Sequence, residues 1–373
     1  MSITPHDERF MAAAIRLSRW HLGRTATNPS VGCLIVKDGV IVGRAVTALS
    51  GRPHAETQAL AEAGVLARGA TAYVTLEPCS HHGKTPPCAE ALIAYGVARV
   101  VISVTDPDPR VSGRGIAMLR EAGIEVDAGA LEAEGRQSLA AYLTRQTKNR
   151  PYVTLKLAVS ADGMIGREGA GQVAITGPEA RAQVQALRAE TDAILVGIGT
   201  AIADDPLLTV RSPGLESQSP IRIVLDPSLA LPLTSKLVAT AREVPVIVVA
   251  SEEGSLSQAE GGASPADMDS RRAALEAAGV EVVHCNPYHP EVLLPALATR
   301  GISSLLVEGG AKTARLFLEA GLVDRIQLYQ APVVIGEGGI ESPLDATDIP
   351  SGFAHTGTLM FGGDRLDEYE RGL

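Results

Sequence analysis

Apolar and polar positions along the first part of the chain alternate with periods that predict helices and strands in turn. Thr4 and Pro5 open a predicted helix, because a threonine side chain can cap a helix and proline suits its first turn. Two apolar stretches, at residues 31–36 and 40–44, flank Asp38-Gly39, which is typical of a hairpin turn. The other predicted elements of this region are strands at residues 71–76, 99–104 and 124–126 and helices at residues 55–66, 88–95, 114–122 and 131–146.

This order, a hairpin followed by alternating elements, indicates an α/β fold with a mixed sheet and helices on both faces. A polar stretch ends at Pro151 and predicts a domain boundary, so the expected domains are residues 1–147 and 148–373. A second alternating series then predicts a second α/β domain, with surface loops at residues 212–220 and 252–267. Its predicted strands lie at residues 152–158, 193–196, 221–225, 244–250, 282–284, 304–307 and 325–330, and its helices at residues 178–190, 270–278, 290–299 and 313–320.

Composition favours a soluble globular protein of the cytoplasm. A length of 373 residues suffices for two domains, and 45% apolar with 20% charged residues is ordinary for this class. The net charge of -10 disfavours a sequence-independent nucleic-acid binder, which needs Lys and Arg to neutralise phosphates. We expect neither a signal peptide nor a membrane span, since no apolar run approaches ~18 residues. Four cysteines are too few for a disulfide scaffold, and their spacing favours metal chemistry.

Three candidate metal ligands stand at predicted helix starts and in the loop between them. His54 begins one helix, Cys79 follows a strand, and Cys88 opens the next helix. One imidazole and two thiolates fill three positions of a tetrahedral zinc site and leave the fourth for water, whose pKa the metal lowers toward ~7. Glu56 lies two residues after His54, where it can take the water proton and pass it to a departing amine. We therefore expect a catalytic zinc ion with Glu56 as the proton shuttle.

A closed structural zinc site is the alternative, since His81 or His82 in the intervening loop could supply a fourth ligand. Taken singly, a histidine at a helix start is more often a cap, and a buried cysteine is more often a packing residue. Cys33 and Cys285 are interpreted as packing residues. The combination of His-Ala-Glu, Pro-Cys and a second cysteine favours the catalytic site.

The motif His-Ala-Glu at residues 54–56, with Pro-Cys at residues 78–79, resembles the signature of zinc nucleobase deaminases. The usual second part is P-C-x-x-C, whereas eight residues separate the two cysteines here. The longer form at residues 77–88 is similar to that of the riboflavin-pathway branch, as are residues 28–33 and 106–109. That family fuses a diaminopyrimidine ribosyl-phosphate deaminase to a reductase.

The resemblance implies a cytidine-deaminase-like first domain in which three residues contact the substrate. By matching position these are Asn28, Lys84 and Asp106. Asp108 stands where the family often has asparagine.

The second domain carries Gly309-Gly310 between a predicted strand and a helix. Glycine lets the backbone approach a ligand there, and helix N-terminal N–H groups are free to bind phosphate. No G-x-G-x-x-G follows a strand, which disfavours a Rossmann domain. With the stretches at residues 156–163 and 197–211, the order of elements resembles the reductase half of the same fusion family, which has a dihydrofolate-reductase-like fold.

The resemblance covers nearly the whole chain and implies sites for NADPH and for substrate in this domain. The residues implied for the cofactor are Ala158, Thr200, Asp204, Gly310, Ala311, Lys312, Thr313, Ala314 and Arg315. Those implied for the substrate are Gln172, Arg188, Leu208, Arg211 and Glu308. Gln172 replaces a small hydroxyl residue, and Ala174 replaces a bulkier aromatic found in some relatives. The choice of NADPH over NADH rests on the resemblance alone.

These observations predict a bifunctional enzyme of riboflavin synthesis that uses Zn²⁺ and NADPH on a small pyrimidine ribosyl phosphate. A homo-oligomer is compatible with the sequence, which does not set the number of subunits. Two other classes of protein fit parts of the sequence. A nucleic-acid deaminase with an accessory domain is disfavoured by the acidic balance, and a non-catalytic zinc module on an unrelated reductase is disfavoured by Glu56 and the open fourth position.

Overall fold

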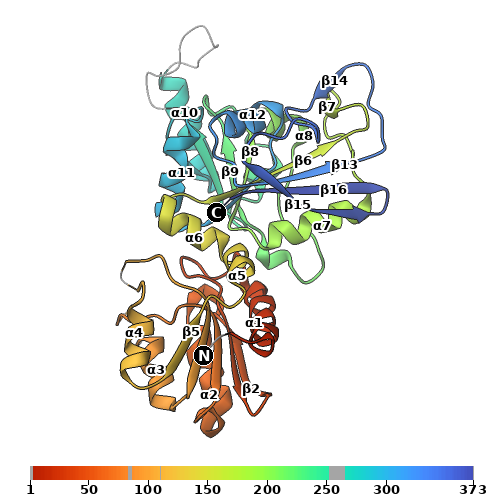
Figure 1. Cartoon of the computed structure of the whole chain (residues 1–373). Helices are drawn as coiled ribbons and strands as arrows, with labels where there is room; N and C mark the ends of the chain where they lie inside the picture. Colours follow the sequence, from red (N-terminus) through yellow and green to blue (C-terminus); the bar gives the residue numbers. More distant parts are fainter. Residues whose placement is uncertain (1–2, 83–85, 110, 252–264, 373) are drawn as a thin grey trace. The chain divides into compact units, whose positions relative to one another are not determined.

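The computed structural model describes residues 3–82, 86–109, 111–251 and 265–372, and the chain divides into two compact units. The first unit ends at Asn149, and the second runs from Arg150 to Gly372 (Figure 1). Among the described helices, none is long and apolar enough to cross a membrane.

The first unit is a five-stranded mixed sheet with strand order β2-β1-β3-β4-β5. Strand β1 runs antiparallel to β2 and β3, while β3, β4 and β5 are parallel to one another. The strands are β1 (Gly32–Lys37), β2 (Val40–Val46), β3 (Thr71–Leu76), β4 (Arg99–Val104) and β5 (Glu125–Ala128). The helices are α1 (Pro5–Ser18), α2 (Ala55–Ala63), α3 (Cys88–Tyr95), α4 (Arg114–Glu121), α5 (Glu132–Ser138) and α6 (Ala140–Lys148).

Helices pack tightly on both faces of this sheet, and glycines such as Gly32 and Gly43 permit close approaches. A Cβ atom on Gly32 would lie 2.1 Å from the carbonyl oxygen of Ala14 in α1, and one on Gly43 would lie 2.2 Å from that of Ala59 in α2. One buried cluster joins α1 to the sheet, and a second joins α2 and α3 to the sheet. The start of α2 is thereby fixed at one end of the strands, where His54 stands.

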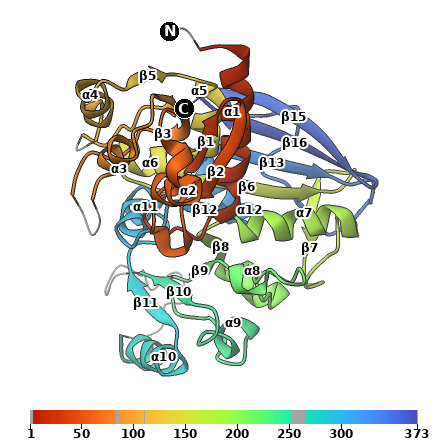
Figure 2. The ribbon, with the colours of Figure 1, turned by 90° about the horizontal axis from the view of Figure 1, so that it is seen from below.

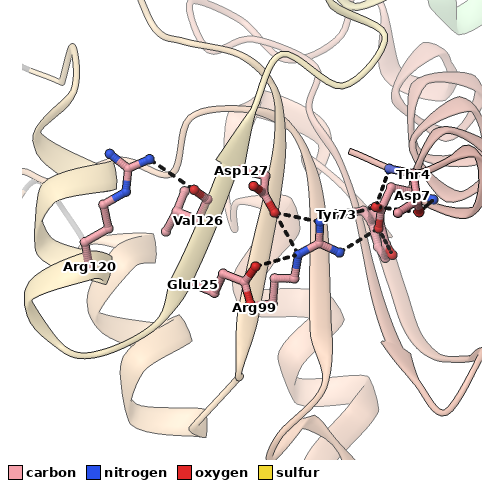
Figure 3. A network of polar contacts seen from close by, with 8 residues as sticks. All are labelled: Thr4, Asp7, Tyr73, Arg99, Arg120, Glu125, Val126 and Asp127. Carbon is pink, nitrogen blue, oxygen red and sulfur yellow. Dashed lines mark hydrogen bonds and ion pairs between the residues drawn. The ribbon is translucent and has the colours of Figure 1, made fainter. Parts of the chain in front are cut away.

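A buried ion network also ties α1 to the sheet (Figure 3). Arg99 at the start of β4 lies 2.7 Å from Asp7 of α1 and 2.6 Å from Asp127 of β5. Asp7 also accepts hydrogen bonds from Tyr73 and from the capping residue Thr4. These contacts hold α1 and the strands β3, β4 and β5 in one arrangement.

The second unit is built on a nine-stranded sheet with strand order β11-β10-β9-β8-β12-β6-β13-β16-β15. The strands from β11 to β13 are parallel, and β16 and β15 add an antiparallel edge. These strands are β6 (Tyr152–Val159), β8 (Ala193–Gly197), β9 (Ile221–Leu225), β10 (Val246–Ala250), β11 (Glu281–His284), β12 (Ser304–Val307), β13 (Arg325–Gln330), β15 (Phe353–Phe361) and β16 (Asp364–Arg371). A separate two-stranded ribbon consists of β7 (Met164–Arg167) and β14 (Gly339–Glu341).

Helices cover both faces of the larger sheet, as the view in Figure 2 also shows. The helices are α7 (Pro178–Ala189), α8 (Ile198–Asp204), α9 (Lys236–Ala239), α10 (Pro265–Ala278), α11 (Pro290–Thr299) and α12 (Ala311–Glu319). One core contains Leu294 of α11 and Phe317 of α12. Another contains Ala201 of α8 and Leu275 of α10. The carboxyl ends of β6, β8, β12 and β13 meet at one edge, where α/β sheets commonly bind ligands.

The mixed sheet of the first unit and the α/β class of both units are confirmed, while several element bounds differ from the prediction. The helix predicted at residues 131–146 is two helices, because Leu139 leaves helical geometry with φ −99° and ψ 8°. The helix predicted from residue 270 begins at Pro265, inside the predicted loop at 252–267, whose first thirteen residues lie outside the described part of the chain. Strand β15 was missed because all of its positions are exposed or half-buried, so it has no apolar period.

Candidate active sites

Helix ends and a strand end bring the three candidate metal ligands together in the first unit. His54 is the N-cap residue of α2, Cys88 is the first residue of α3, and Cys79 lies in the loop that follows β3. Helix N-termini carry partial positive charge, which favours thiolates. The same packing that places α2 and α3 against one face of the sheet therefore assembles the ligands.

The geometry of these three side chains fits a tetrahedral zinc ion. The Nδ1 atom of His54 lies 3.3 Å from Sγ of Cys88 and 3.7 Å from Sγ of Cys79. Bonds of about 2.0 to 2.3 Å to one zinc ion place ligand atoms roughly 3.6 Å apart. Within the described residues no further His, Cys, Asp or Glu joins this group, and the exposed His82 lies 3.0 Å from Glu90 instead.

Hydrogen bonds within the group shift the pKa values of the two thiols in opposite directions. The pKa of Cys79 is lowered to about 4, chiefly because the Cys88 side chain donates to it, and the backbone N–H of Cys88 adds a contact of 3.2 Å. The pKa of Cys88 is raised, since it is the donor and is buried. The pKa of His54 is raised by its hydrogen bond to Cys79. The site thus favours negative charge on sulfur before any cation binds.

Glu56 lies in the first turn of α2 and is 4% exposed. Burial raises the pKa of its carboxyl group, and the neighbouring His54 opposes that rise. A carboxyl group in this setting can both accept and return a proton. Its place beside the three ligands, without being one of them, suits proton transfer.

Asp106 is buried beside the end of β4 and is fixed by neighbours that sequence reasoning missed. The hydroxyl of Tyr142 in α6 donates to both of its carboxylate oxygens, at 3.1 and 3.0 Å, and the backbone N–H of Asp108 donates at 2.9 Å. Burial raises the pKa of Asp106. Its own backbone N–H donates to Glu77, which precedes Pro78 and Cys79. This chain of bonds links the metal loop to Asp106.

Glu77 organises the loop between β4 and α4. Its carboxylate accepts the backbone N–H groups of Asp106, Gly113, Gly115 and Ile116 at 3.0 to 3.3 Å. The signal for this role was its position two residues before Cys79, which the sequence showed, but its partners lie 29 to 39 residues away.

The other two predicted substrate residues of this unit are Asn28 and Lys84. Asn28 is half-buried and packs against Gly51, where a Cβ atom would lie 2.3 Å from Nδ2 of the asparagine. Gly51 has a φ of +87°, so both space and backbone geometry favour glycine there. Lys84 lies outside the described residues.

In the second unit, Arg188 of α7 pairs with Glu308, which follows β12. The guanidinium Nε and Nη2 atoms donate to the two carboxylate oxygens at 2.8 and 2.9 Å, and Nη1 donates to the carbonyl of Thr209 at 3.3 Å. The pKa of Lys156 in β6 is lowered, chiefly because burial desolvates its ammonium group. The nearby charge of Glu308 opposes this shift, and that of Arg188 adds to it. The Nζ atom of Lys156 lies 5.6 Å from the ring centre of Tyr329. Lys156 and Tyr329 were missed by sequence reasoning.

Most of the predicted cofactor residues lie in the first part of α8 or at the start of α12. The backbone N–H of Gly310, the N-cap of α12, donates to Oγ1 of Thr200 in α8 at 3.1 Å. Cβ atoms on Gly197 and Gly309 would each lie 2.5 Å from Thr313, so these glycines allow the two helix starts to meet. The other predicted members differ in exposure: Lys312 and Arg315 are exposed, Ala311 is half-buried, and Ala314 is buried in the core.

A backbone segment with unusual geometry, residues 205–211, carries two of the five predicted substrate residues, Leu208 and Arg211. Asp205 and Leu208 have positive φ angles of 39° and 55°, and Leu208 is buried. Such residues cost energy and persist where the surroundings hold them. The buried Arg222, missed in the sequence, donates to the carbonyl of Leu207 at 3.1 Å. Arg211 at the end of the segment is exposed.

Three predicted residues lie at the margins of this site. Asp204 is at the end of α8, where burial raises the pKa of its carboxyl group. Ala158 lies on β6 and packs against the cluster formed by Ile175, Ala331 and Ile335. Gln172 is exposed.

A mixed-sheet unit with a three-ligand metal group, joined to a parallel-sheet unit with paired helix starts, defines a two-domain deaminase and reductase. Residues 4–104 match the cytidine and deoxycytidylate deaminase zinc-binding region, and residues 151–361 match the RibD C-terminal domain. The chain belongs to the RibD family. It is a bifunctional deaminase and reductase of riboflavin biosynthesis, acts on a small molecule, and uses zinc and NADPH.

Relatives match over nearly the full length of the chain. The riboflavin biosynthesis protein RibD of Aquifex aeolicus is 42% identical over 332 residues, covering 89% of this chain and 88% of the relative. That of Escherichia coli is 42% identical over 343 residues, covering 88% and 89%. A crystal structure of a diaminohydroxyphosphoribosylaminopyrimidine deaminase/5-amino-6-(5-phosphoribosylamino)uracil reductase from Thermotoga maritima matches with a TM-score of 0.84 and 33% identity, covering 98% of this chain and 99% of that one.

Proposed function

We propose that the predicted first domain, residues 1–147, hydrolyses the ring amine of a diaminopyrimidinone ribosyl phosphate and releases ammonia. His54, Cys79 and Cys88 hold the zinc ion, because their ligand atoms lie within 4.8 Å of one another. Zinc bound there supplies Lewis acidity, which lowers the pKa of water to about 7. The three-ligand group beside a buried carboxyl group is the observation that carries this proposal.

Glu56 is the proton shuttle of the deamination. Its carboxylate takes a proton from the attacking water, and the resulting acid gives that proton to the departing amine. The raised pKa of this buried group suits both halves of the transfer. His54 and the two cysteines stay deprotonated as ligands and take no part in it.

Asn28 and Asp106 hold the substrate on this unit, with Lys84 as a third contact. Asp106 is fixed by the Tyr142 hydroxyl and the Asp108 backbone, so its carboxylate presents a set direction. A fixed acceptor orients a ring amine without further loss of side-chain freedom.

The predicted second domain, residues 148–373, reduces the ribosyl group to ribityl. NADPH supplies a hydride when bound. We assign its binding to Ala158, Thr200, Asp204 and the start of α12 at residues 310–315. In that reduction the anomeric carbon would receive the hydride, its bond to the ring oxygen would break, and the oxygen would take a proton.

Charged groups near the end of β6 suit this proton transfer. Lys156 has a lowered pKa and interacts electrostatically with Glu308. Its ammonium group can therefore release a proton to the ring oxygen. Glu308 in turn is held by Arg188. Gln172 and Leu208 contact the pyrimidine ring. Arg211, which is exposed at the end of the strained segment, binds the phosphate.

We further propose a cytoplasmic enzyme that accepts free pyrimidine nucleotides and not nucleic acid, because acids outnumber bases, 43 to 33. Homo-oligomers remain part of this proposal. Incubation with tRNA or single-stranded DNA should yield no ammonia.

Product analysis tests the proposed function. The protein is incubated with the diaminopyrimidine ribosyl phosphate, with and without NADPH, and products are identified by mass. Without NADPH we expect ammonia and the deaminated ribosyl compound only, and with NADPH the ribityl compound. Reduction of the substrate that still carries its amine, or deamination that requires NADPH, would contradict the assignment of one reaction to each unit.

A further inference from the structure

Asp162, in the turn after β6, joins two loops that are far apart in sequence. Asp162 is half-buried, and its Oδ1 atom accepts from Oγ of Ser160 at 2.6 Å and from the backbone N–H of Ile335 at 3.0 Å. Its Oδ2 atom accepts from the backbone N–H of Gly336 at 2.7 Å. Both carboxylate oxygens are therefore engaged, and one of the bonds spans 174 residues.

Further bonds make this junction the base of the ribbon β7–β14. The backbone N–H of Ala161 donates to the carbonyl of Val333 at 2.8 Å, and that of Ser342 donates to Gly163 at 2.9 Å. Arg167 of β7 donates to the carbonyl of Ile335. In Figure 1 the two strands of the ribbon lie together, apart from the main sheet. In the described part of the chain the ribbon forms no β-ladder with the nine-stranded sheet. The hydrogen bonds of this junction therefore determine the position of the ribbon.

The junction also fixes an apolar wall beside the reductase site. Ile175, Ala331 and Ile335 are buried together, and Met164 of β7 packs against them. Ala158 of β6, the cofactor contact proposed above, packs against the same cluster. Ile335 is thus both a member of this wall and a hydrogen-bond partner of Asp162. A loosened junction would shift the wall next to Ala158.

We propose that Asp162 is a positioning residue of the reductase, which holds the β7–β14 ribbon and its apolar wall in place for NADPH. The inference rests on the proposed location of the cofactor site. The positioning role requires a carboxylate at residue 162, because its two oxygens accept hydrogen bonds from three donors. An amide in its place would direct an NH₂ group at the N–H of Ile335 or of Gly336.

Asp162→Asn in the full chain tests this role, with Asp345→Asn as the matched control. Asp345 is exposed, and its carboxylate likewise accepts from nearby donors: the backbone and hydroxyl of Thr347 and the backbone of Asp348, at 2.6 to 3.1 Å. Loss of a hydrogen bond to a charged group should raise KM for NADPH by roughly tenfold or more in Asp162→Asn, while kcat falls less. The control should leave both unchanged.

Two measurements separate positioning from a structural role. The midpoint of thermal unfolding should stay near that of the control variant. Amide exchange in residues 164–175 should slow when NADPH binds the wild type, and should slow less in Asp162→Asn. An unchanged KM for NADPH, or a loss of kcat alone with a lowered unfolding midpoint, would overturn the proposal.

A third variant distinguishes this failure from failure of the cofactor site itself. Thr200→Ala removes the hydroxyl that binds Gly310 and should raise KM for NADPH. If Thr200→Ala raises it and Asp162→Asn does not, the positioning role is wrong and the site stands. If neither changes it, both are wrong.

Discussion

Arg188 and Glu308 form a buried, two-pronged ion pair in the second unit, with N–O distances of 2.8 and 2.9 Å. The third guanidinium nitrogen of Arg188 donates to the carbonyl of Thr209. The resemblance had implied that Arg188 and Glu308 both contact substrate. Because all three nitrogens have protein partners, we assign phosphate binding to Arg211 and the orientation of Glu308 to Arg188.

Arg211→Ala should weaken binding of the pyrimidine phosphate. A charge-assisted hydrogen bond is worth about 1.5–3 kcal/mol, so KM for the pyrimidine should rise roughly 10- to 150-fold. KM for NADPH and the deaminase rate should not change, and Arg211→Lys should restore binding only in part, because lysine lacks the fork. Steady-state kinetics measure this, with the exposed Arg242→Ala as control. Wild-type kinetics in Arg211→Ala would disprove the assignment.

Arg188→Ala should have a second effect that Arg211→Ala lacks. It leaves Glu308 buried without its partner, which costs about 3–5 kcal/mol of stability when a buried pair is broken. The thermal unfolding midpoint of the second unit should fall together with reductase activity. A variant with an unchanged midpoint would show that Glu308 finds water or another cation.

The acid stability of the first unit should depend on Asp7. Burial alone would raise the pKa of Asp7, but hydrogen bonds from Arg99, Thr4 and Tyr73 outweigh it and hold the pKa below its usual range. The folded pKa lies below the unfolded value of about 3.9, so this stabilisation is present above pH ~4 and is lost as pH falls through the folded pKa.

Asp7→Asn should therefore lower the free energy of unfolding by about 2 kcal/mol at pH 7, and the difference from wild type should shrink below pH 4. Urea unfolding of both proteins at pH 7, 5 and 3 measures it. A difference that stays constant down to pH 3 would contradict the role of the carboxylate charge.

Zinc should be present at about one ion per chain, since the described residues contain one three-ligand group. Metal removal by a chelator should stop ammonia release and leave reduction of the deaminated substrate intact. Cys79→Ser should lose zinc, whereas Cys285→Ala, a buried cysteine of the second unit, should retain it. Full deamination by metal-free protein would refute the metal mechanism.

Cleavage near Asn149 should yield two pieces that each fold, because each unit has its own buried core. Circular dichroism and cooperative unfolding of the separate pieces measure this. The prediction fails if neither piece unfolds cooperatively.

The sequence predicted local features well and distant pairings poorly. His54, Cys79 and Cys88 could be found because their residue types and spacing carry the chemistry directly. The hydroxyl of Tyr142 on Asp106 could not, because a tyrosine in a predicted helix gives no sign of its partner 36 residues away. The pairing of Arg188 with Glu308, 120 residues apart, depends on how α7 packs on the sheet.

Strands without an apolar period were equally hidden. The charged strand β16 and the exposed strand β15 form the antiparallel edge of the larger sheet, yet their sequences resemble loops. Strand β16 pairs with β13, whose apolar pattern the sequence did show, and β15 pairs in turn with β16.

Glu56→Gln tests the central claim most directly, because it separates metal binding from proton transfer in the first unit and leaves the second unit untouched. The isosteric amide cannot carry the proton, and general acid–base groups contribute typically ~10²–10⁴-fold. Ammonia release, zinc content and reduction of the deaminated substrate are measured on the same preparation. We predict that ammonia release falls at least about a hundredfold, while zinc and reductase activity match the wild type. A loss of less than about tenfold with zinc in place would contradict the account, since another group would then move the proton.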